Sequence, residues 1–270
     1  MNYTTKPSPQ YPVAPNAALP EIDQLAAEAA VRLPVGSGPL AAMKSTTDYL
    51  LAVLLLPPAL IAVLVAAALV KFTSRGPVFY TQTRVGLNGR LYRIVKIRTM
   101  YHNCELTSGI QWAKKKDSRV TPVGRFLRAA HIDELPQLWN VLRGEMSLVG
   151  PRPERPEVIA SKCLEQLVPG YRLRSNVKPG VTGLAQVQLP ADTDIASVRR
   201  KVEYDLYYVQ NQSLLLDLRL IVATLFKPLV SPKWLRRLFL LPGQQTVSFA
   251  FQNQVTLPPQ AEPHSDLQPA

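Results

Sequence analysis

Cysteine and histidine are scarce in this chain. Among 270 residues there are two cysteines, Cys104 and Cys163, which lie far apart, and three histidines without the spacing of metal ligands. This scarcity excludes a disulfide framework and a structural zinc site, and it fits a protein that faces a reducing compartment. We also expect no secretory signal peptide, because no basic start leads directly into an apolar core.

Acidic residues are few as well. The chain has 19 Asp and Glu against 31 Lys and Arg, which gives a formal net charge of +12 at pH 7. Such an excess of positive charge favours anionic partners, namely nucleic acid, anionic lipid or phosphorylated substrates.

Charge of either sign is missing from Tyr49–Val70. This run is long enough to span a bilayer, which needs about 20 apolar residues. Pro57 and Pro58 lie near its middle, where they delete backbone donors and kink a helix. The next stretch, Lys71–Met100, contains seven Lys or Arg and no acid, so this side should be cytoplasmic.

Three arrangements of the apolar run are open. One is a single kinked transmembrane helix with the N-terminal tail outside, and another is a buried core helix, which so long an uncharged run disfavours. We predict the third, a re-entrant helix-break-helix over residues 41–71 that dips into the membrane and returns, with both ends cytoplasmic. Lys44 and Asp48 lie four residues apart and would pair on one face of this helix.

The fold class predicted for the whole chain is α+β and mainly helical. Residues 72–230 should form a small cytosolic catalytic domain that carries a β-hairpin and interfacial amphipathic helices. Val78–Val85 and Leu91–Met100 are the two β-rich runs, and Asn88-Gly89 between them is a strong hairpin signal. Lys178–Gly183 reads as a series of turns.

Helices are expected where apolar residues recur at helical spacing. One should begin at Thr121, one near Ser197, and one should cover Leu214–Phe226. Another is indicated by a buried face made of Leu135, Leu138, Trp139 and Leu142.

The two ends of the chain differ from the middle in composition. Residues 1–40 are rich in Pro and Ala, and we expect a disordered tail there. Residues 231–270 predict a basic amphipathic segment around Trp234–Leu241 that rests on anionic lipid, followed by a second disordered tail. The Lys114–Lys116 run is most simply a solvated charge cluster.

The strongest chemical signal lies in residues 131–153. Asp133 and Glu134 are adjacent, and Arg152 stands between Pro151 and Pro153. A carboxylate pair can hold a divalent metal or act as a nucleophile, and a proline-locked arginine can clamp a phosphate. Together these residues predict phosphoryl chemistry.

Asp133 also has a structural interpretation as a helix N-cap, with Glu134 complementing the helix dipole. Pro136 weakens this interpretation. If Asp133 were the cap, Pro136 would lack the amide that a cap often binds, and if Pro136 began the helix, Asp133 would lie outside the capping position.

Three further cations are candidates for the same phosphate-binding cluster. Lys96 and Arg98 fall on one face of the second strand by its period of two, and Arg128 lies on the helix that begins at Thr121. The alternative for Lys96 and Arg98 is the decoration of an exposed strand edge, where Lys is common.

Seven sequence blocks occur together in a fixed order. They are Gly76-Pro-Val-Phe79, Arg84-Val-Gly86, Lys96-Ile-Arg-Thr-Met100, Asp133-Glu-Leu-Pro-Gln-Leu-Trp-Asn140, Met146-Ser-Leu-Val-Gly-Pro-Arg-Pro153, Lys178-Pro-Gly-Val-Thr-Gly-Leu-Ala-Gln186 and Tyr204-Asp-Leu-Tyr-Tyr208. On these blocks the chain, over roughly residues 44–230, resembles the bacterial sugar transferases, which are monotopic polyprenyl-phosphate phosphoglycosyl transferases.

The resemblance implies a function and a site. It implies a re-entrant membrane helix broken by proline, here at Pro57-Pro58 where the family usually has Ser-Pro. It implies a catalytic Asp133–Glu134 dyad that binds Mg²⁺, and a phosphate site at Arg152. The reaction implied moves a hexose-1-phosphate from a UDP-sugar to undecaprenyl phosphate and releases UMP, through a covalent aspartyl intermediate.

The resemblance also implies a place in the cell and a set of partners. The site would face the cytoplasm at the inner membrane, in the first membrane step of exopolysaccharide or glycan biosynthesis. The expected partners are UDP-sugar, polyprenyl phosphate and the lipid bilayer, and a homodimer or other glycan-assembly enzymes are compatible with this role. No nucleic acid is expected.

A different class of function is a membrane-anchored scaffold whose basic face binds anionic lipid or nucleic acid without catalysis. The dyad beside a Pro-Arg-Pro loop argues against it, since lipid binding needs no convergent carboxylates. Release of nucleotide from a sugar nucleotide, with Mg²⁺ and membranes present, would distinguish the two classes.

Overall fold

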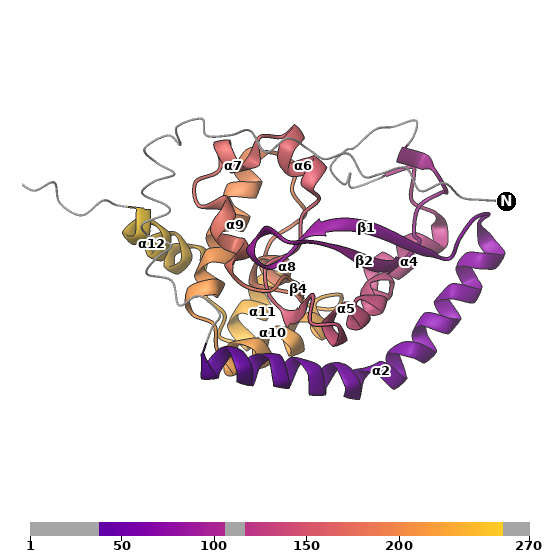
Figure 1. The fold of residues 1–270 in the computed structure, drawn as a ribbon, viewed down its shortest axis with the longest axis horizontal. Coiled ribbons are helices and arrows are strands. Elements are labelled where there is room, and N and C mark those ends of the chain that lie inside the picture. Colours follow the sequence, from indigo (N-terminus) through magenta and orange to yellow (C-terminus); the bar gives the residue numbers. More distant parts are fainter. Residues whose placement is uncertain (1–37, 106–116, 256–270) are drawn as a thin grey trace, which may run out of the picture.

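The computed structural model describes residues 38–105 and 117–255. The predicted N-terminal tail up to residue 37, the Lys114–Lys116 run and residues 256–270 lie outside the described residues. The described part is mainly helical with two small sheets, which confirms the predicted α+β class (Figure 1).

One long helix is followed by a hairpin and then by many short elements. In chain order the helices and strands are α2 (Pro39–Thr73), β1 (Phe79–Val85), η1 (Leu87–Gly89), β2 (Leu91–Ile97), α4 (Pro122–Ala129), η2 (Ile132–Gln137), α5 (Leu138–Leu142), β3 (Ser147–Val149), α6 (Pro156–Ser161), α7 (Leu164–Leu167), η3 (Tyr171–Asn176), β4 (Gly180–Thr182), α8 (Leu184–Gln188), α9 (Ile195–Gln210), α10 (Leu214–Phe226), α11 (Pro232–Leu238) and α12 (Gln244–Val255). We call residues 79–105 and 117–255 the globular body.

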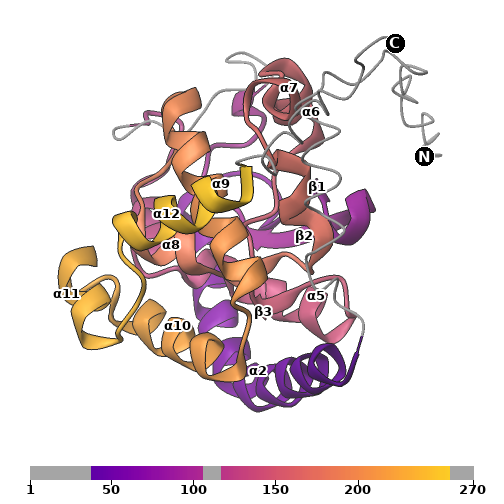
Figure 2. The same ribbon diagram turned by 90° about the vertical axis from the view of Figure 1, so that its left-hand side faces the viewer.

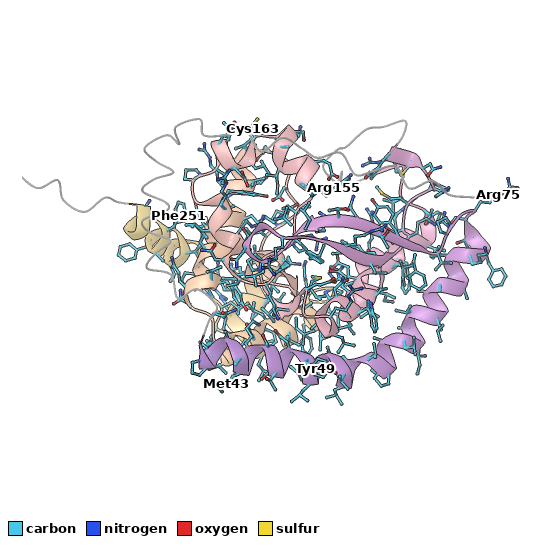
Figure 3. The ribbon with its side chains drawn as sticks, viewed as in Figure 1. Met43, Tyr49, Arg75, Arg155, Cys163 and Phe251 are labelled. Atoms are coloured by element: carbon cyan, nitrogen blue, oxygen red, sulfur yellow. The ribbon has the colours of Figure 1, made fainter. Side chains whose placement is uncertain are left out.

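The long helix α2 is apolar and mostly exposed. By length and composition it is capable of crossing a membrane. Most of its large apolar side chains point away from the globular body, as the sticks along its outer side show (Figure 3). Its buried residues form one stripe: Lys44, Asp48, Ala52, Ala59, Val63, Ala66 and Val70.

A bend divides α2 into two legs. The first leg carries Met43 and Tyr49, and the second climbs toward Arg75 at the far side of the molecule (Figures 1 and 3). Pro57 and Pro58 lie inside the helix, where each removes an intrahelical hydrogen bond. The break expected at the two prolines is therefore present as a bend, and the re-entrant topology stays a prediction.

A buried polar network holds the first leg of α2 against the globular body. Lys44 pairs with Asp48 at 3.4 Å, as its spacing predicts, and also with Asp217 of α10 at 2.7 Å. Asp48 accepts a hydrogen bond from the Ser147 hydroxyl at 2.6 Å, and Tyr208 donates to Asp217 at 2.7 Å. Helix α2 is thus joined to β3, α9 and α10 through a network whose charged side chains are themselves buried.

The predicted hairpin is confirmed. Strands β1 and β2 pair antiparallel from Phe79–Ile97 to Val85–Leu91. Asn88 and Gly89 have φ angles of 53° and 76°, and this left-handed conformation is the reason why an Asn-Gly pair suits the turn.

The prediction of turns at Lys178–Gly183 is wrong in part. Gly180–Thr182 forms strand β4, which pairs in parallel with β3. The backbone segments around Gly150 and Gly180 approach closely. A Cβ atom on Gly180 would lie 2.1 Å from the Gly150 nitrogen, and one on Gly150 would lie 2.4 Å from the Lys178 carbonyl oxygen. Only glycine at both positions permits this contact.

The point near the C-terminus at which regular structure ends also differs from the prediction. Residues 244–255, expected to be disordered, form helix α12, which packs on α9. Val247 is its anchor and is fully buried in the main core, together with Leu235 of α11. The segment after residue 230 therefore packs onto α8 and α9, and its contact with lipid stays a prediction.

Other helix predictions are close. Helix α4 begins after Thr121, whose side chain accepts from the Gly124 amide, and α10 has the predicted bounds. Helix α9 begins two residues before Ser197, because Asp194 and Ser197 form a capping box. Trp139 was expected on a buried face and is instead 56 % exposed.

Candidate active site

The two adjacent carboxylates lie on the short 3₁₀ helix η2. His131 occupies the position before this helix with a left-handed φ of 56°, and no side chain caps it. Pro136 is inside η2, and the position before α5 is held by Gln137. Asp133 is therefore not an N-cap, and the structural interpretation of this residue is wrong.

Glu134 is held by two cations at one oxygen atom. Its Oε1 accepts from the Lys96 ammonium at 2.7 Å and from the Arg152 guanidinium at 2.9 Å. Burial opposes ionisation of this carboxyl, but Arg152 and Lys96 outweigh it and keep the pKa of Glu134 well below its usual range. Glu134 is thus a permanent anion at neutral pH.

Asp133 has the opposite environment. It is 7 % exposed, and no hydrogen bond to its carboxylate is present within residues 38–105 and 117–255. Burial, followed by the negative charge of Glu134, raises the pKa of Asp133, while Lys96 and Arg128 act against this rise. Two neighbouring carboxylates with pKa values shifted in opposite directions are typical of a site with divided roles.

The loop that carries Arg152 is rigid. Four successive carbonyl groups from Pro151 to Glu154 accept hydrogen bonds. The donors are the Gly180 amide (2.9 Å), the Arg174 guanidinium (2.9 Å), the Arg84 guanidinium (3.2 Å) and the Val85 amide (3.0 Å). Because Pro151 and Pro153 also fix their φ angles, the backbone presents Arg152 to Glu134 in one orientation.

Asn140 joins the strand that carries Lys96 to the helix after the dyad. Its Nδ2 donates to the Arg93 carbonyl at 2.8 Å and to Glu145 at 2.7 Å, and its Oδ1 accepts from the Val95 amide at 3.3 Å. A single buried amide thereby joins β2 to α5, the helix that directly follows η2.

The structure brings three of the four predicted cations to this site. Lys96 and Arg152 contact Glu134 directly. Arg128 donates to the Thr99 hydroxyl at 2.8 Å and is near enough to Asp133 to lower its pKa. The phosphate-binding role of these three cations stays a prediction.

Arg98 lies elsewhere. It is 6 % exposed, and its guanidinium donates to the backbone carbonyls of Ser74, at 2.9 Å, and Arg75, just after α2. Strand β2 ends at Ile97, so the alternation that would have placed Arg98 beside Lys96 stops one residue before it. Arg98 fastens the end of α2 to the hairpin, and we remove it from the candidate site.

Two residues near the carboxylates were missed from the sequence. Lys227 follows α10, and burial, followed by the positive charge of Arg152, lowers its pKa. His131 directly precedes η2, and burial, followed by the charge of Lys227, lowers its pKa. A lysine at a helix C-terminus was the available signal for Lys227, but its contact with this site is set by the tertiary fold.

The donor set is compatible with Mg²⁺. In the described ranges no cluster of three or more His, Cys, Asp or Glu side chains is capable of holding a metal, so a closed protein cage is excluded there. Mg²⁺ usually takes one or two carboxylates and completes its shell with water and substrate phosphates. Asp133 and the Oε2 atom of Glu134 offer such a pair of hard oxygen donors.

Comparison with known proteins agrees with this geometry. Residues 40–231 match the family model described as bacterial sugar transferase. The chain belongs to this family. The matched region includes the bend of α2, the hairpin, both carboxylates and the Arg152 loop, so the bacterial sugar transferase unit is most of the described structure.

Three relatives illustrate the similarity. The chain is 42 % identical over 183 residues to a UDP-N-acetylgalactosamine-undecaprenyl-phosphate N-acetylgalactosaminephosphotransferase of Aeromonas hydrophila, covering 68 % of this chain and 43 % of the relative. It is 44 % identical over 170 residues to a UDP-glucose:undecaprenyl-phosphate glucose-1-phosphate transferase of Klebsiella pneumoniae, covering 62 % and 36 %. It is 43 % identical over 185 residues to the exopolysaccharide production protein PSS of Rhizobium leguminosarum bv. phaseoli, covering 67 % and 91 %.

The chain thus spans less than half the length of the first two relatives and nearly all of the third.

Proposed function

We propose that this chain transfers a sugar-1-phosphate from a UDP-sugar to undecaprenyl phosphate and releases UMP. The observation that carries the proposal is the unequal pair of carboxylates, with Asp133 buried and without a hydrogen-bond partner in the described structure while Glu134 is fixed by Lys96 and Arg152. The names of the relatives, which pair undecaprenyl phosphate with UDP-sugars, support the same reaction class.

The first step is nucleophilic. An ionised Asp133 oxygen attacks the phosphorus atom that bears the sugar, and the phosphorus–oxygen bond to the UMP phosphate breaks. The electron pair of that bond leaves with UMP, and an aspartyl phosphosugar remains on the enzyme. A carboxylate is suited to this task because it needs no proton removed once it is ionised.

The second step regenerates the enzyme. An oxygen of the undecaprenyl phosphate attacks the same phosphorus atom, the bond to Asp133 breaks, and the carboxylate leaves with its electron pair. The product is undecaprenyl diphosphosugar. Both steps bring anions together, so fixed cations are needed, and Arg152, Lys96 and Arg128 are the side chains in place to bind phosphate oxygens.

Mg²⁺, held by Glu134 and Asp133 when bound, would neutralise phosphate charge and orient the diphosphate. Glu134 itself keeps Arg152 and Lys96 close together, and both cations lower the pKa of the neighbouring Asp133. We infer that this positioning is its role in addition to metal binding.

The site belongs at a membrane surface. Helix α2 carries an exposed apolar surface along both legs, and α10 lies alongside its first leg (Figure 2). The basic stretch after α2 favours the cytoplasmic face. We propose that α2 is re-entrant in the inner membrane and that the globular body rests on the cytoplasmic leaflet, where the lipid phosphate is reached.

The decisive experiment measures UMP release by the purified chain in detergent, with Mg²⁺, undecaprenyl phosphate and a panel of UDP-sugars. One UDP-sugar should support release, and a radiolabelled sugar should remain on the wild-type protein after denaturation when the acceptor is omitted. Asp133→Asn should lose both signals, because an amide is a poor nucleophile.

Asp117→Asn alters an aspartate that pairs only with Arg119 among the contacts described for it, and it should keep both signals. Release of no UMP from any UDP-sugar would favour the non-catalytic scaffold. A normal rate in Asp133→Asn would refute the aspartyl mechanism.

A further inference from the structure

An apolar cavity of about 160 Å³ lies between α2 and the segment that carries the dyad. Four residues of α2 and four residues of the globular body line it, and all eight are apolar. A charged group has no partner there. The ligand that suits such a cavity is a hydrocarbon.

The cavity follows from the proline break. Residues 53–58 are exposed without interruption, so α2 leaves the globular body over this stretch. It returns at Ala59 and Val63, which are 7 % and 9 % exposed. Leu56, Ala59, Leu60 and Val63 line the cavity, and they therefore flank the space that the bend opens.

The opposite wall of the cavity adjoins the candidate active site. Leu135 and Pro136 belong to this wall and directly follow Glu134, and Val95 directly precedes Lys96. Consecutive Cα atoms are about 3.8 Å apart. A ligand in the cavity would therefore lie against the same two backbone segments that carry Glu134 and Lys96.

The mouth of the cavity is open toward the membrane side of α2. Leu60 is 53 % exposed and Trp139 is 56 % exposed, although both line the cavity. A large exposed tryptophan beside an apolar helix is typical of a membrane interface. A lipid chain is thus able to continue from the cavity into the bilayer.

We propose that this cavity binds the first isoprene unit of the polyprenyl phosphate acceptor, an inference that rests on the proposed function. An apolar cavity of about 150 Å³ accommodates benzene, which has six carbons, so the space suits a five-carbon isoprene unit. The phosphate, attached to the first carbon of that unit, is then directed to Arg152 and Asp133. On this proposal, the proline break shapes the helix and also opens the space in which the acceptor binds.

Two pairs of variants test the cavity. Val63→Phe fills it, and its control is Val65→Phe, the same change at a residue that is 57 % exposed and does not line the cavity. Leu60→Trp narrows the mouth at an exposed position, where folding is unaffected by extra volume, and its control is Leu64→Trp, at 61 % exposure.

Binding of geranylgeranyl phosphate is measured first, in detergent and without UDP-sugar, so that the result is independent of turnover. Both cavity variants should weaken binding at least about tenfold, and both controls should bind as the wild type does. The KM for undecaprenyl phosphate in UMP release should rise in parallel in the same two variants.

The outcomes separate the two proposals. Wild-type binding and an unchanged KM in Leu60→Trp would overturn the cavity proposal and leave the transferase proposal standing. Weakened lipid binding in both cavity variants without UMP release by the wild type would support the cavity and overturn the transferase. If Val63→Phe fails to fold, the lipid binding and the KM of Leu60→Trp test the cavity proposal on their own.

Discussion

The guanidinium of Arg174 donates a hydrogen bond to the backbone carbonyl of Arg152 at 2.9 Å. The same Nη2 atom also donates to Asp205 of α9 at 2.5 Å. Arg174 is 6 % exposed, and the Asp205 carboxylate fixes it in place. The orientation of the loop that presents Arg152 to the dyad therefore depends on a charge pair behind it.

This relationship predicts that Arg174→Lys lowers kcat about tenfold, because a lysine keeps the charge but lacks the planar fork that serves two acceptors. The control is Arg172→Lys, at an exposed residue that pairs with Glu165. UMP release and melting temperature should be measured together. A melting temperature that falls with kcat unchanged would show that Arg174 is only structural.

Arg152→Lys should lose at least about tenfold in rate, equivalent to about 1.4 kcal/mol of transition-state stabilisation. A lysine ammonium retains the charge near Glu134 but loses the two-pronged geometry that suits phosphate. Steady-state UMP release at saturating UDP-sugar is the measurement. Kinetics like those of the wild type would remove Arg152 from the phosphate site.

Glu134→Gln should raise the Mg²⁺ concentration needed for half-maximal rate and lower the maximal rate strongly. The amide is a weaker metal ligand, and it no longer neutralises Lys96 and Arg152. A Mg²⁺ titration of UMP release is the test, with Glu165→Gln, which pairs with the exposed Arg172, as the control. An unchanged Mg²⁺ dependence would exclude Glu134 as a ligand.

The pH dependence should report Asp133. Its pKa is raised by burial and by Glu134, and only the ionised form is a nucleophile, so the rate should fall as pH is lowered through this pKa. Lys96 lowers the pKa of Asp133, hence Lys96→Met should raise it and shift the acidic limb of kcat/KM to higher pH.

Arg93→Met is the control for this shift, since Arg93 is an exposed cation on the same strand that contacts Thr81. Its profile should coincide with that of the wild type. An acidic limb that stays in place in Lys96→Met would mean that the titrating group is not Asp133.

Topology can be tested with cysteine labelling in a background with Cys104→Ser and Cys163→Ser. Ser8→Cys in the N-terminal tail and Thr73→Cys at the end of α2 should both be shielded from an impermeant thiol reagent in whole cells. Both should react once the membrane is opened. Labelling of Ser8→Cys from outside intact cells would establish an ordinary transmembrane anchor.

Replacing Pro57 with Leu and Pro58 with Ala should straighten α2, because the missing donors return. A straight helix of 35 residues is about 52 Å long at 1.5 Å per residue, more than the hydrocarbon core of about 30 Å. A measurable fraction of tails should then be labelled from outside, with a matching loss of UMP release.

Local signals in the sequence predicted the features that depend on neighbouring residues. The Asn88-Gly89 turn, the helix start at Thr121 and the pairing of Lys44 with Asp48 all depend on spacings of four residues or fewer. Lys96 was placed correctly beside the dyad, since β2 is regular up to Ile97. Arg98 was placed there wrongly, since the strand ends one residue before it.

The misses depend on contacts between distant segments. Strands β3 and β4 have three residues each, too few to show a period of two, and they become strands because Gly150 and Gly180 allow the backbones to meet. Lys227 reaches the dyad only through the packing of α10. Helix α12 was missed because only Val247 and Phe251 of its mostly polar sequence pack against the core.

The pairing of Lys44 with Asp217 has a consequence for biogenesis. The two residues are 173 positions apart, and a ribosome that adds about 5–20 residues per second needs roughly 10 to 35 s to bridge them. During that interval Asp217 is absent, and of the two carboxylates that pair with Lys44 in the described structure Asp48 alone has been synthesised. On the proposed topology, α2 therefore enters the bilayer with Lys44 paired to Asp48, and the contact between Lys44 and Asp217 forms only after α10 has been synthesised.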